Sequence, residues 1–249
     1  MQYLNSCSVN IVLTSYNHAE YTNNALLSLS RTTPRGYTLY VLDDHSTDDV
    51  KVVVERFPFA NFVGFACHRG LTALWNDAYG LALKNGADYL VLCNNDVKFS
   101  EGWLVELISA MQEHDIAVPV TNAPGHNKAQ NVRAYMPDYQ PDDSWQAVDE
   151  VSKQLAHLKP LKADKINGFC MMLKMSWLKS AVGTDDKPFD EAKFPLYGAE
   201  DDFFTRHKPD TVIVPSSFIF HYKAVSTAKS LFPSQNYRMK ETTCPISLN

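Results

Sequence analysis

Short apolar runs alternate with segments of helical spacing through the first half of the chain. Each of four β-rich runs is followed by a segment whose apolar residues recur every three or four positions. The predicted strands are residues 9–13, 38–42, 61–66 and 89–93. The predicted helices are residues 20–30, 50–56, 71–84 and a segment that begins near Ser100. Four strand–helix repeats predict an α/β fold, with right-handed βαβ units on a mostly parallel central sheet flanked by helices.

The second half of the chain is less regular. Residues 119–160 are rich in proline, aspartate, asparagine and glutamine, so we expect long, partly ordered loops of the kind that carry substrate specificity. Apolar patterning resumes at residues 166–173, a short strand is predicted at 218–221, and residues after Ser230 have no clear period. Because no linker divides the chain, we predict one domain over residues 1–230 and a C-terminal tail over 231–249.

Composition limits the setting in which the protein works. The net charge of −5 at pH 7 argues against a surface that coats nucleic acid. The five cysteines are dispersed without a CxxC pair, so we expect neither a disulfide framework nor a zinc site, and a reducing cytoplasm is the natural location. Residues 1–8 are polar, so we expect no signal peptide, and no apolar run reaches the roughly 18–20 residues that span a bilayer.

Polar side chains follow three of the predicted strands. They occupy residues 14–17, 43–44 and 94–96. Ligands of parallel α/β sheets bind outside the carboxyl ends of the strands, so these groups are expected to meet at one edge. A carboxylate there, Asp96, suits Mg²⁺ or Mn²⁺, which prefer oxygen ligands. The alternative is that Asp96 and the pair Asp43 and Asp44 only form polar turns.

Acidic and basic residues late in the chain complete the candidate chemistry. Glu200, Asp201 and Asp202 are candidates for a general base, although acids also favour the N-terminus of a helix for electrostatic reasons. His221 follows an apolar run and becomes a candidate metal ligand only together with Asp96; otherwise it is a structural histidine. Lys223 is a candidate for binding phosphate oxygens, or a solvated lysine in a loop.

In this order, the motifs resemble those of the family 2 glycosyltransferases, which have the Rossmann-like, nucleotide-binding GT-A fold. The segments that carry the resemblance are VNIVLTSYNHAEYTNNALLSL, YVLDDHSTDD, HRGLTALWNDAYGLAL, VLCNND, the block NGFCMMLKMSWLKSAVG with FDEAKFPLYGAEDDFFTRH, and FIFHYKAVST. This sequence departs from the family pattern at four positions. They are His45 and Ala78 in place of glycine, His68 in place of asparagine, and Asn94 in place of the first acid of the metal motif.

The resemblance implies an inverting transfer of sugar from a nucleotide-diphosphate sugar, with a UDP-sugar favoured, to an acceptor hydroxyl. It implies a donor half over about residues 1–118 and an acceptor half over about 119–230. Asp201 would be the catalytic base, beside Glu200 and Asp202, and Asp96 and His221 would hold Mn²⁺ or Mg²⁺. The implied donor-binding residues are Thr14, Tyr16, Asn17, Asp43, Asp44, Arg69, Asn76, Asn94, Asn95 and Lys223.

Alternatives remain open at this point. The acceptor is a glycan, a lipid-linked glycan, a protein or a hydroxymethylated DNA base, and the basic residues of 203–240 would suit DNA, although a solvated face explains them as well. A nucleotidyltransferase would open with a glycine-rich phosphate loop, whereas residues 14–19 contain no glycine. An inactive sugar-binding scaffold would not need Asp96, Glu200, Asp201 and His221, all of which are present.

Overall fold

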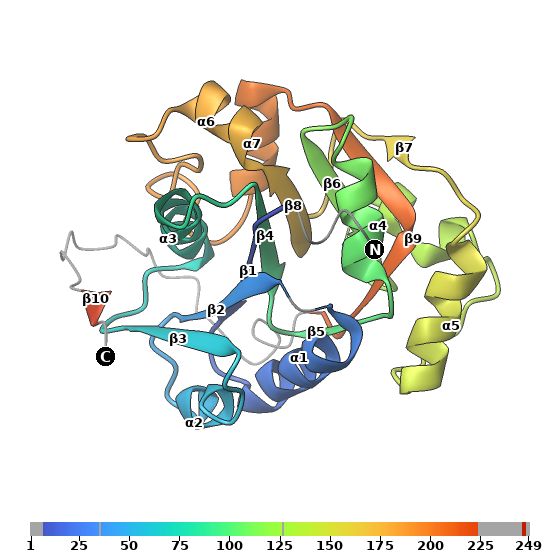
Figure 1. Ribbon diagram of the computed structural model, residues 1–249, viewed down its shortest axis with the longest axis horizontal. Helices are drawn as coiled ribbons and strands as arrows, with labels where there is room; N and C mark the ends of the chain where they lie inside the picture. The colour runs from blue at the N-terminus through green and yellow to red at the C-terminus, as the bar shows by residue number, and fades with distance from the viewer. Residues whose placement is uncertain (1–6, 35, 126, 224–245, 248–249) are drawn as a thin grey trace.

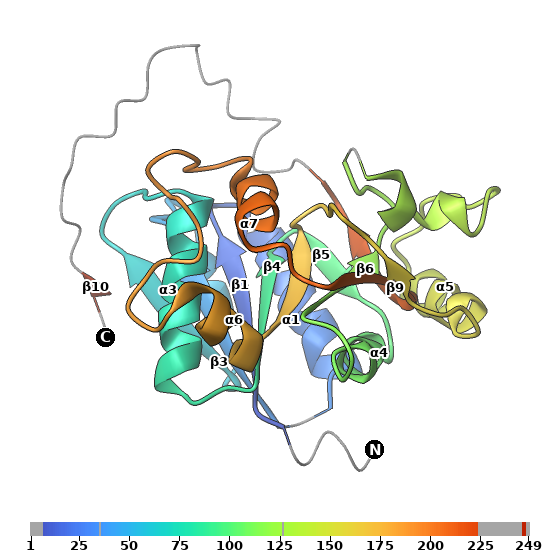
Figure 2. The same cartoon turned by 90° about the horizontal axis from the view of Figure 1, so that it is seen from above.

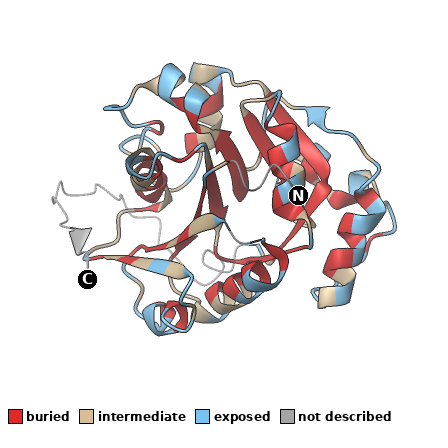
Figure 3. Ribbon diagram, in the orientation of Figure 1, coloured by how far each residue is buried: buried red, intermediate tan, exposed pale blue. Residues whose placement is uncertain are grey.

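The computed structural model describes residues 7–34, 36–125, 127–223 and 246–247 (Figure 1). Its described residues form a ten-stranded sheet in the order β10-β3-β2-β1-β4-β8-β6-β9-β5, with β7 paired to β9. Helices cover both faces of the sheet, and the strands form the buried centre (Figure 3). The predicted α/β fold is confirmed.

The first half of the chain builds the parallel part of this sheet. Its strands are β1 (Val9–Ser15), β2 (Tyr37–Asp43), β3 (Ala60–Phe65) and β4 (Tyr89–Asn94), and its helices are α1 (Ala19–Thr32), α2 (Val50–Val54) and α3 (Leu71–Lys84). The strands pair in parallel with β1 in the middle, as βαβ connections require. Figure 1 shows α1 and α2 on one side of these strands and α3 on the other, so two apolar cores form.

The second half adds strands of both directions. Its elements are β5 (Val97–Phe99), α4 (Trp103–Ala110), β6 (Ile116–Val120), β7 (Leu161–Lys162), β8 (Cys170–Lys174), α6 (Met175–Val182), α7 (Ala199–His207) and β9 (Thr211–His221). β8 pairs antiparallel with β4, which joins the two halves into one sheet. β5 pairs antiparallel with β9 and sets Val97 opposite His221. This short strand has no sequence signal, because three residues are too few for a period.

Residues 119–160 are more ordered than we expected from their composition. They contain the end of β6, the short 3₁₀ helices η2 (Lys128–Gln130) and η3 (Val132–Ala134), and α5 (Trp145–Leu155). The prediction of long, partly ordered loops is therefore wrong for α5. The signal was present, since the Ser144 side chain caps the helix by accepting from the Ala147 N–H at 3.3 Å. Val148, Val151 and Leu155 then form its buried stripe.

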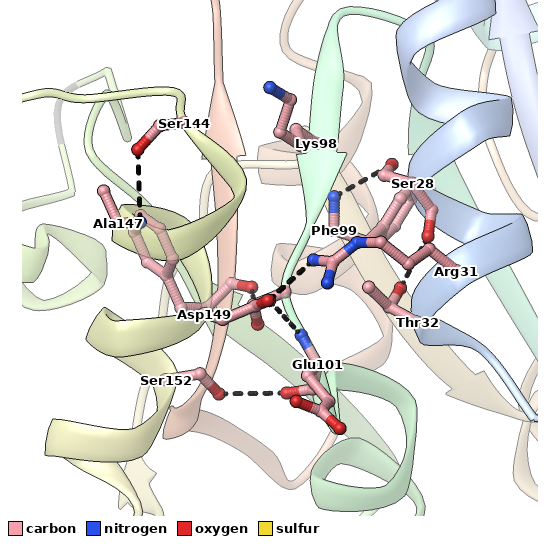
Figure 4. A network of polar contacts seen from close by, with 12 residues as sticks. Ser28, Arg31, Thr32, Lys98, Phe99, Glu101, Ser144, Ala147, Asp149 and Ser152 are labelled. Carbon is pink, nitrogen blue, oxygen red and sulfur yellow. Dashed lines mark hydrogen bonds and ion pairs between the residues drawn. The ribbon is translucent and has the colours of Figure 1, made fainter.

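Helix α5 lies at the opposite end of the molecule from α3 (Figure 2) and is held by a polar network (Figure 4). The Asp149 carboxylate accepts hydrogen bonds from the Arg31 guanidinium on α1 and from the Glu101 backbone N–H, each at 2.9 Å. The Ser152 hydroxyl donates to the backbone oxygen of Ser216 on β9 at 2.9 Å. The Arg31 guanidinium also lies 4.6 Å from the centre of the Trp145 ring. One buried carboxylate thus connects α1, α5 and the turn between β5 and α4.

Asp149→Ala is expected to lower the free energy of unfolding by about 1–3 kcal/mol, because it leaves the Glu101 N–H and the Arg31 guanidinium without their acceptor. Asp149→Asn retains one oxygen for the Glu101 N–H and should cost clearly less, since partly exposed ion pairs contribute little. Urea unfolding of the two variants measures the difference. Equal losses in both would contradict the role given to the Glu101 hydrogen bond.

Three further expectations concern the cysteines, the membrane and the tail. Cys93 and Cys170 are free thiols, whereas Cys67 is disulfide-bonded, which differs from the expectation of reduced cysteines throughout. No helix in the described part of the chain has the length and apolar character to span a membrane. Of the predicted tail, residues 246–247 pair with β3 as β10 (Ile246–Ser247), and the rest lies outside the described residues.

Candidate active site

A cavity of about 410 Å³ lies at the carboxyl ends of the parallel strands. Its walls come from the ends of β1 and β4, the starts of α3 and α7, the loops before β8 and after β6, and the end of β9. Of the residues proposed from sequence, it is lined by Thr14, Tyr16, Asp44, Asn94, Asn95, Asp96, Glu200, His221 and Lys223. The fold therefore brings most of the candidate residues to one cavity, as the strand-end argument predicts.

Asp96 and His221 meet at the centre of this cavity wall. The His221 Nε2 atom lies 3.2 Å from the Asp96 Oδ1 atom, and both side chains are buried. The antiparallel pairing of β5 with β9 produces this contact, because Asp96 directly precedes β5 and His221 ends β9. A backbone hydrogen bond of 2.9 Å from the Tyr222 N–H to the Asp96 carbonyl closes the pairing.

The imidazole of His221 is held on its other side. Its Nδ1 atom lies 3.2 Å from the Ala123 carbonyl, so an Nδ1–H that donates to this carbonyl would leave Nε2, which faces Asp96, to bind a cation. Asn122 exchanges two hydrogen bonds with the His221 backbone, at 2.7 and 3.0 Å. Phe169 stacks on the ring at 5.0 Å between centroids. A metal-ligating histidine needs this arrangement of an oriented ring and a fixed tautomer.

The donor set fits a hard divalent cation that completes its shell with ligand oxygens. Asp96 offers a carboxylate and His221 a ring nitrogen, both on the cavity wall. No third histidine, cysteine, aspartate or glutamate joins them within the described residues. Asn94, which stands where the family has an acid, also lines the cavity and carries an amide oxygen. A cation held by two protein groups leaves positions for phosphate oxygens.

Asp44 organises the turn that precedes α3. Its carboxylate accepts the backbone N–H groups of Arg69 at 2.7 Å and Gly70 at 2.8 Å, and it pairs with the His68 Nδ1 atom at 2.8 Å. Tyr16 packs against the His68 ring, with 4.4 Å between the centroids. The side chain of Asp44 is nearly completely buried, so these partners occupy the carboxylate. Asp44 shapes the cavity wall as much as it lines it.

Asp43 and Asn17 hold the turn after β2. Asp43 accepts hydrogen bonds from the backbone N–H and the hydroxyl of Ser46, and burial raises the pKa of its carboxyl. The Asn17 N–H donates to the Ser46 hydroxyl at 2.7 Å, and its side-chain oxygen accepts the Thr47 N–H at 2.8 Å. Neither Asp43 nor Asn17 lines the cavity. Their contacts match the turn alternative rather than direct contact with a ligand.

Arg69 and Asn76 also lie outside the cavity lining. The Arg69 guanidinium pairs with Asp77 at 2.6 Å. The Asn76 amide donates to the Phe189 carbonyl at 3.0 Å and to the Glu191 carboxylate at 2.7 Å. It also accepts the Phe189 N–H at 3.1 Å. Both side chains hold neighbouring segments together, which the sequence could not distinguish from contact with a donor.

Polar residues at the ends of β1 and β4 form hydrogen bonds with one another. Asn95 donates from its side-chain amide to the hydroxyls of Thr22 at 2.9 Å and Ser15 at 3.2 Å. The Thr14 hydroxyl donates to the Cys93 carbonyl at 3.3 Å. Both Thr14 and Asn95 line the cavity, and Lys223 reaches it from the residues that follow β9. Ser226, Thr227 and Lys229, which follow Lys223, lie outside the described residues.

The three adjacent acids Glu200, Asp201 and Asp202 occupy the first turn of α7, where the helix dipole favours negative charge. Only Glu200 lines the cavity. Asp202 pairs with Arg206, one turn later on the same helix, at 2.7 Å. Successive helical residues point about 100° apart, so the acids cannot all face one site. The geometry separates a cavity-facing acid from two that are not part of the lining.

The apolar side of the cavity was missed at the sequence level. Leu71, Leu74 and Trp75 on α3 and Leu196 and Tyr197 before α7 all line it. The helical spacing of the first three residues indicates a core face, and nothing in the sequence distinguishes a core face from a cavity wall. His68 lines the cavity as well, in a position where the family pattern has asparagine.

The contact between His68 and Asp44 predicts that the free energy of unfolding depends on pH. The hydrogen bond to Asp44 raises the pKa of His68 above its usual value of 6.5. A folded-state pKa above the unfolded one stabilises the fold fully below about pH 6.5, and this contribution is lost as the pH rises through the raised pKa. Urea midpoints should therefore fall from pH 6 to pH 8.5 more steeply in the wild type than in His68→Asn. Parallel pH profiles would contradict the charged His68–Asp44 pair.

The family model described as Glycosyl transferase family 2 matches residues 10–180, most of the chain. The chain belongs to glycosyl transferase family 2. No curated protein matches its sequence closely. The family 2 resemblance of the strand-end motifs is thereby confirmed, while the individual site residues remain predictions.

Solved glycosyltransferase structures share the fold of this family 2 member at low identity. GalNAc-T7 with UDP, GalNAc and Mn²⁺ is 13% identical, with a TM-score of 0.60 over 86% of this chain and 44% of its own. S. aureus TarS 1–349 in complex with UDP-GlcNAc is 15% identical, with a TM-score of 0.57 over 86% and 58%. The mannosyltransferase PcManGT from Pyrobaculum calidifontis with GDP-Man and Mn²⁺ is 16% identical, with a TM-score of 0.57 over 86% and 56%.

The chain spans about half the length of these structures. Their likeness confirms the GT-A fold. The nucleotides, sugars and Mn²⁺ named for these structures are ligands of those proteins.

Proposed function

We propose that this family 2 member transfers a sugar from a nucleoside diphosphate sugar, with a UDP-sugar favoured, to an acceptor hydroxyl by an inverting single displacement. One observation carries the proposal. A single cavity brings together the strand-end polar residues, the Asp96–His221 pair and the Glu200 carboxylate. Family membership supports the reaction class, and structures of the same fold that contain UDP, UDP-GlcNAc or GDP-Man support the donor class.

In this proposal, each side of the cavity binds a different part of the donor. Thr14, Tyr16 and the loop held by Asp44 receive the nucleoside, because they lie at the strand ends where such ligands bind. Asp96 and His221 would hold Mn²⁺ or Mg²⁺, which would supply positive charge to the diphosphate leaving group. The Ala123 carbonyl keeps the Nε2 atom of His221 available for that role. Lys223 is placed to contact phosphate oxygens at the same edge.

The proposed general base is Glu200. It takes the proton of the acceptor hydroxyl as the acceptor oxygen forms a bond to the anomeric carbon, while the bond from that carbon to the diphosphate oxygen breaks. A general base must come within hydrogen-bond reach of the proton it removes, and Glu200 alone of the three acids lines the cavity. The family resemblance favours Asp201, which remains a competing prediction. The resemblance identifies the acidic motif, but it does not decide which of the three adjacent acids is the base.

The other readings of the sequence gain less support. The basic residues that would contact DNA lie partly outside the described residues, so a hydroxymethylated DNA base remains an untested acceptor. A nucleotidyltransferase is disfavoured by the family match. An inactive scaffold would not need the Asp96 carboxylate and the His221 ring side by side on the cavity wall. A cytoplasmic location remains a prediction.

Heat stability in the presence of nucleotides tests the proposal. A nucleotide that binds only the native state raises the free energy of unfolding by about 2.7 kcal/mol at a hundredfold excess over its dissociation constant. UDP, GDP and CDP are each added with and without Mn²⁺. We expect UDP to give the largest shift and to need Mn²⁺ for it. No shift with any of the three, with or without metal, would contradict the proposed function.

A further inference from the structure

The cavity wall beside Glu200 is apolar. Leu71, Leu74 and Trp75 come from α3, and Leu196 and Tyr197 come from the segment that leads into α7. Polar side chains line the rest of the cavity. They come from the ends of β1, β4 and β9, Asp96 and His221 among them, and from the loops that contain Asp44, His68 and Asn167. The metal-binding side and the base side of the cavity therefore differ in chemical character.

The two parts of this wall are joined by close contacts. The Thr72 N–H donates to the Pro195 carbonyl at 3.2 Å, and the Thr72 hydroxyl donates to the Phe194 carbonyl. Gly70 has φ +89°, and a Cβ atom there would lie 2.6 Å from the Pro195 oxygen. The same Cβ would lie 3.5 Å from the Leu196 side chain. The start of α3 and the segment before α7 thus form one continuous surface.

Glu200 adjoins this surface at Gly168. A Cβ atom on Gly168 would lie 3.1 Å from the Trp75 ring and 3.5 Å from the Glu200 carboxyl carbon. The indole and the carboxylate therefore contact the same glycine. Trp75 is only 2% exposed, and its Nε1 atom has no hydrogen-bond partner among the described residues. The atom of the Trp75 ring nearest to this position is Cη2, on the benzene edge, so the Glu200 carboxylate and an apolar ring edge share one neighbour.

Tyr197 extends this wall to the mouth of the cavity. It is 68% exposed, more than any other large apolar side chain in the described residues, and it lines the cavity. The other large apolar side chains that are exposed, such as Leu161 and Phe59, do not line it. Because Tyr197 is exposed and lines the cavity, its ring is available to a ligand that enters there.

We propose that the acceptor carries a flat apolar group, an aromatic or alicyclic ring, directly beside the hydroxyl that receives the sugar. This inference rests on the proposed function. The acceptor hydroxyl must reach Glu200, so the atoms next to it contact Leu71, Trp75, Leu196 and Tyr197. A polyhydroxylated acceptor would lose water from its hydroxyls there, at a cost of about 1–3 kcal/mol for each group left unpaired. An apolar ring loses no hydrogen bonds and gains burial.

Binding of two probe alcohols to the full chain, saturated with UDP and diamagnetic Mg²⁺, tests the proposal. The probes are 4-methoxybenzyl alcohol, which has an aromatic ring beside its hydroxyl, and methyl β-D-glucopyranoside, which does not. Ligand-observed NMR titration gives the dissociation constants. Tyr197→Ser and Leu196→Asn are compared with wild type, and Leu161→Asn serves as the control, because Leu161 is exposed on β7 away from the cavity.

We expect the aromatic alcohol to bind more tightly than the glucoside. Each cavity variant should weaken its binding about tenfold, the change expected when roughly one apolar side-chain contact is lost, and Leu161→Asn should leave it unchanged. Equal or tighter binding of the glucoside, no binding of the aromatic alcohol, or equal binding by wild type and both cavity variants would overturn the proposal. Failure of UDP itself to bind would instead contradict the proposed function, so the two failures are distinguishable.

Discussion

Glu200→Gln is expected to lower turnover by about 10²–10⁴-fold and to leave UDP binding unchanged, because the substitution removes a general base and keeps the shape of the side chain. Glu200 alone of the three acids at the start of α7 lines the cavity, so the loss should be specific to it. The measurement is the rate of UDP release from a UDP-sugar with an acceptor present. UDP affinity is measured in parallel by titration.

Asp201→Asn and Asp202→Asn are matched controls from the same helical turn. Asp201→Asn should retain most of the activity if Glu200 is the base. Asp202→Asn breaks the 2.7 Å ion pair with Arg206, and should affect stability slightly rather than turnover. A collapse of turnover in Asp201→Asn with a near-normal Glu200→Gln would reverse the assignment in favour of the family register.

Asp96→Asn is expected to abolish the part of UDP binding that depends on Mn²⁺. The amide keeps the volume of the carboxylate and lacks the negative charge that a hard cation requires. Wild type at a hundredfold excess of UDP with Mn²⁺ should gain about 2.7 kcal/mol of stability, and the variant should respond no more than wild type does to UDP alone. Thermal unfolding with the four combinations of UDP and Mn²⁺ measures the effect.

Asp138→Asn is the control for this experiment. Asp138 is exposed and does not line the cavity, so its substitution removes an equal charge from the same protein. It should retain the full response to UDP with Mn²⁺. An equal loss in both variants would show that net charge, rather than the Asp96–His221 pair, governs the response.

The parallel half of the fold and the position of the site could be predicted from the sequence. Strand and helix periods are local patterns, and the carboxyl ends of parallel strands share one edge, so Thr14 and Asp96 could be placed near each other without coordinates. The residue types of His221 and Asp96 suggested a metal-binding pair, and the family resemblance favoured it, but no local pattern predicts their contact. It depends on β5, a strand of three residues with no period to detect.

Other features depend on long-range contacts that local patterns do not contain. Asn76 and Arg69 are polar residues next to a ligand motif, yet their side chains hold Glu191 and Asp77. Trp75 has the spacing of a core residue and turns out to line the cavity. In each case the outcome is decided by which distant segment packs against the side chain. One sequence gives no evidence of that packing.

Helix α5 shows a different limit. Its residues are mostly polar, because it lies at the edge of the molecule and buries only one narrow stripe. The high content of aspartate and glutamine in residues 119–160 concealed a cap at Ser144 and the buried stripe that follows it. Composition averaged over forty residues is therefore a weaker guide than spacing over eleven.

A structure of the full chain with UDP and Mn²⁺ tests the central claim most directly. The account predicts the cation between the Asp96 carboxylate and the His221 Nε2 atom, in contact with the diphosphate. It predicts the uridine in contact with Thr14 and Tyr16. The β-phosphate, which carries the sugar in the donor, should point toward Glu200. A nucleotide bound elsewhere, or one bound here with the cation away from Asp96 and His221, would contradict it.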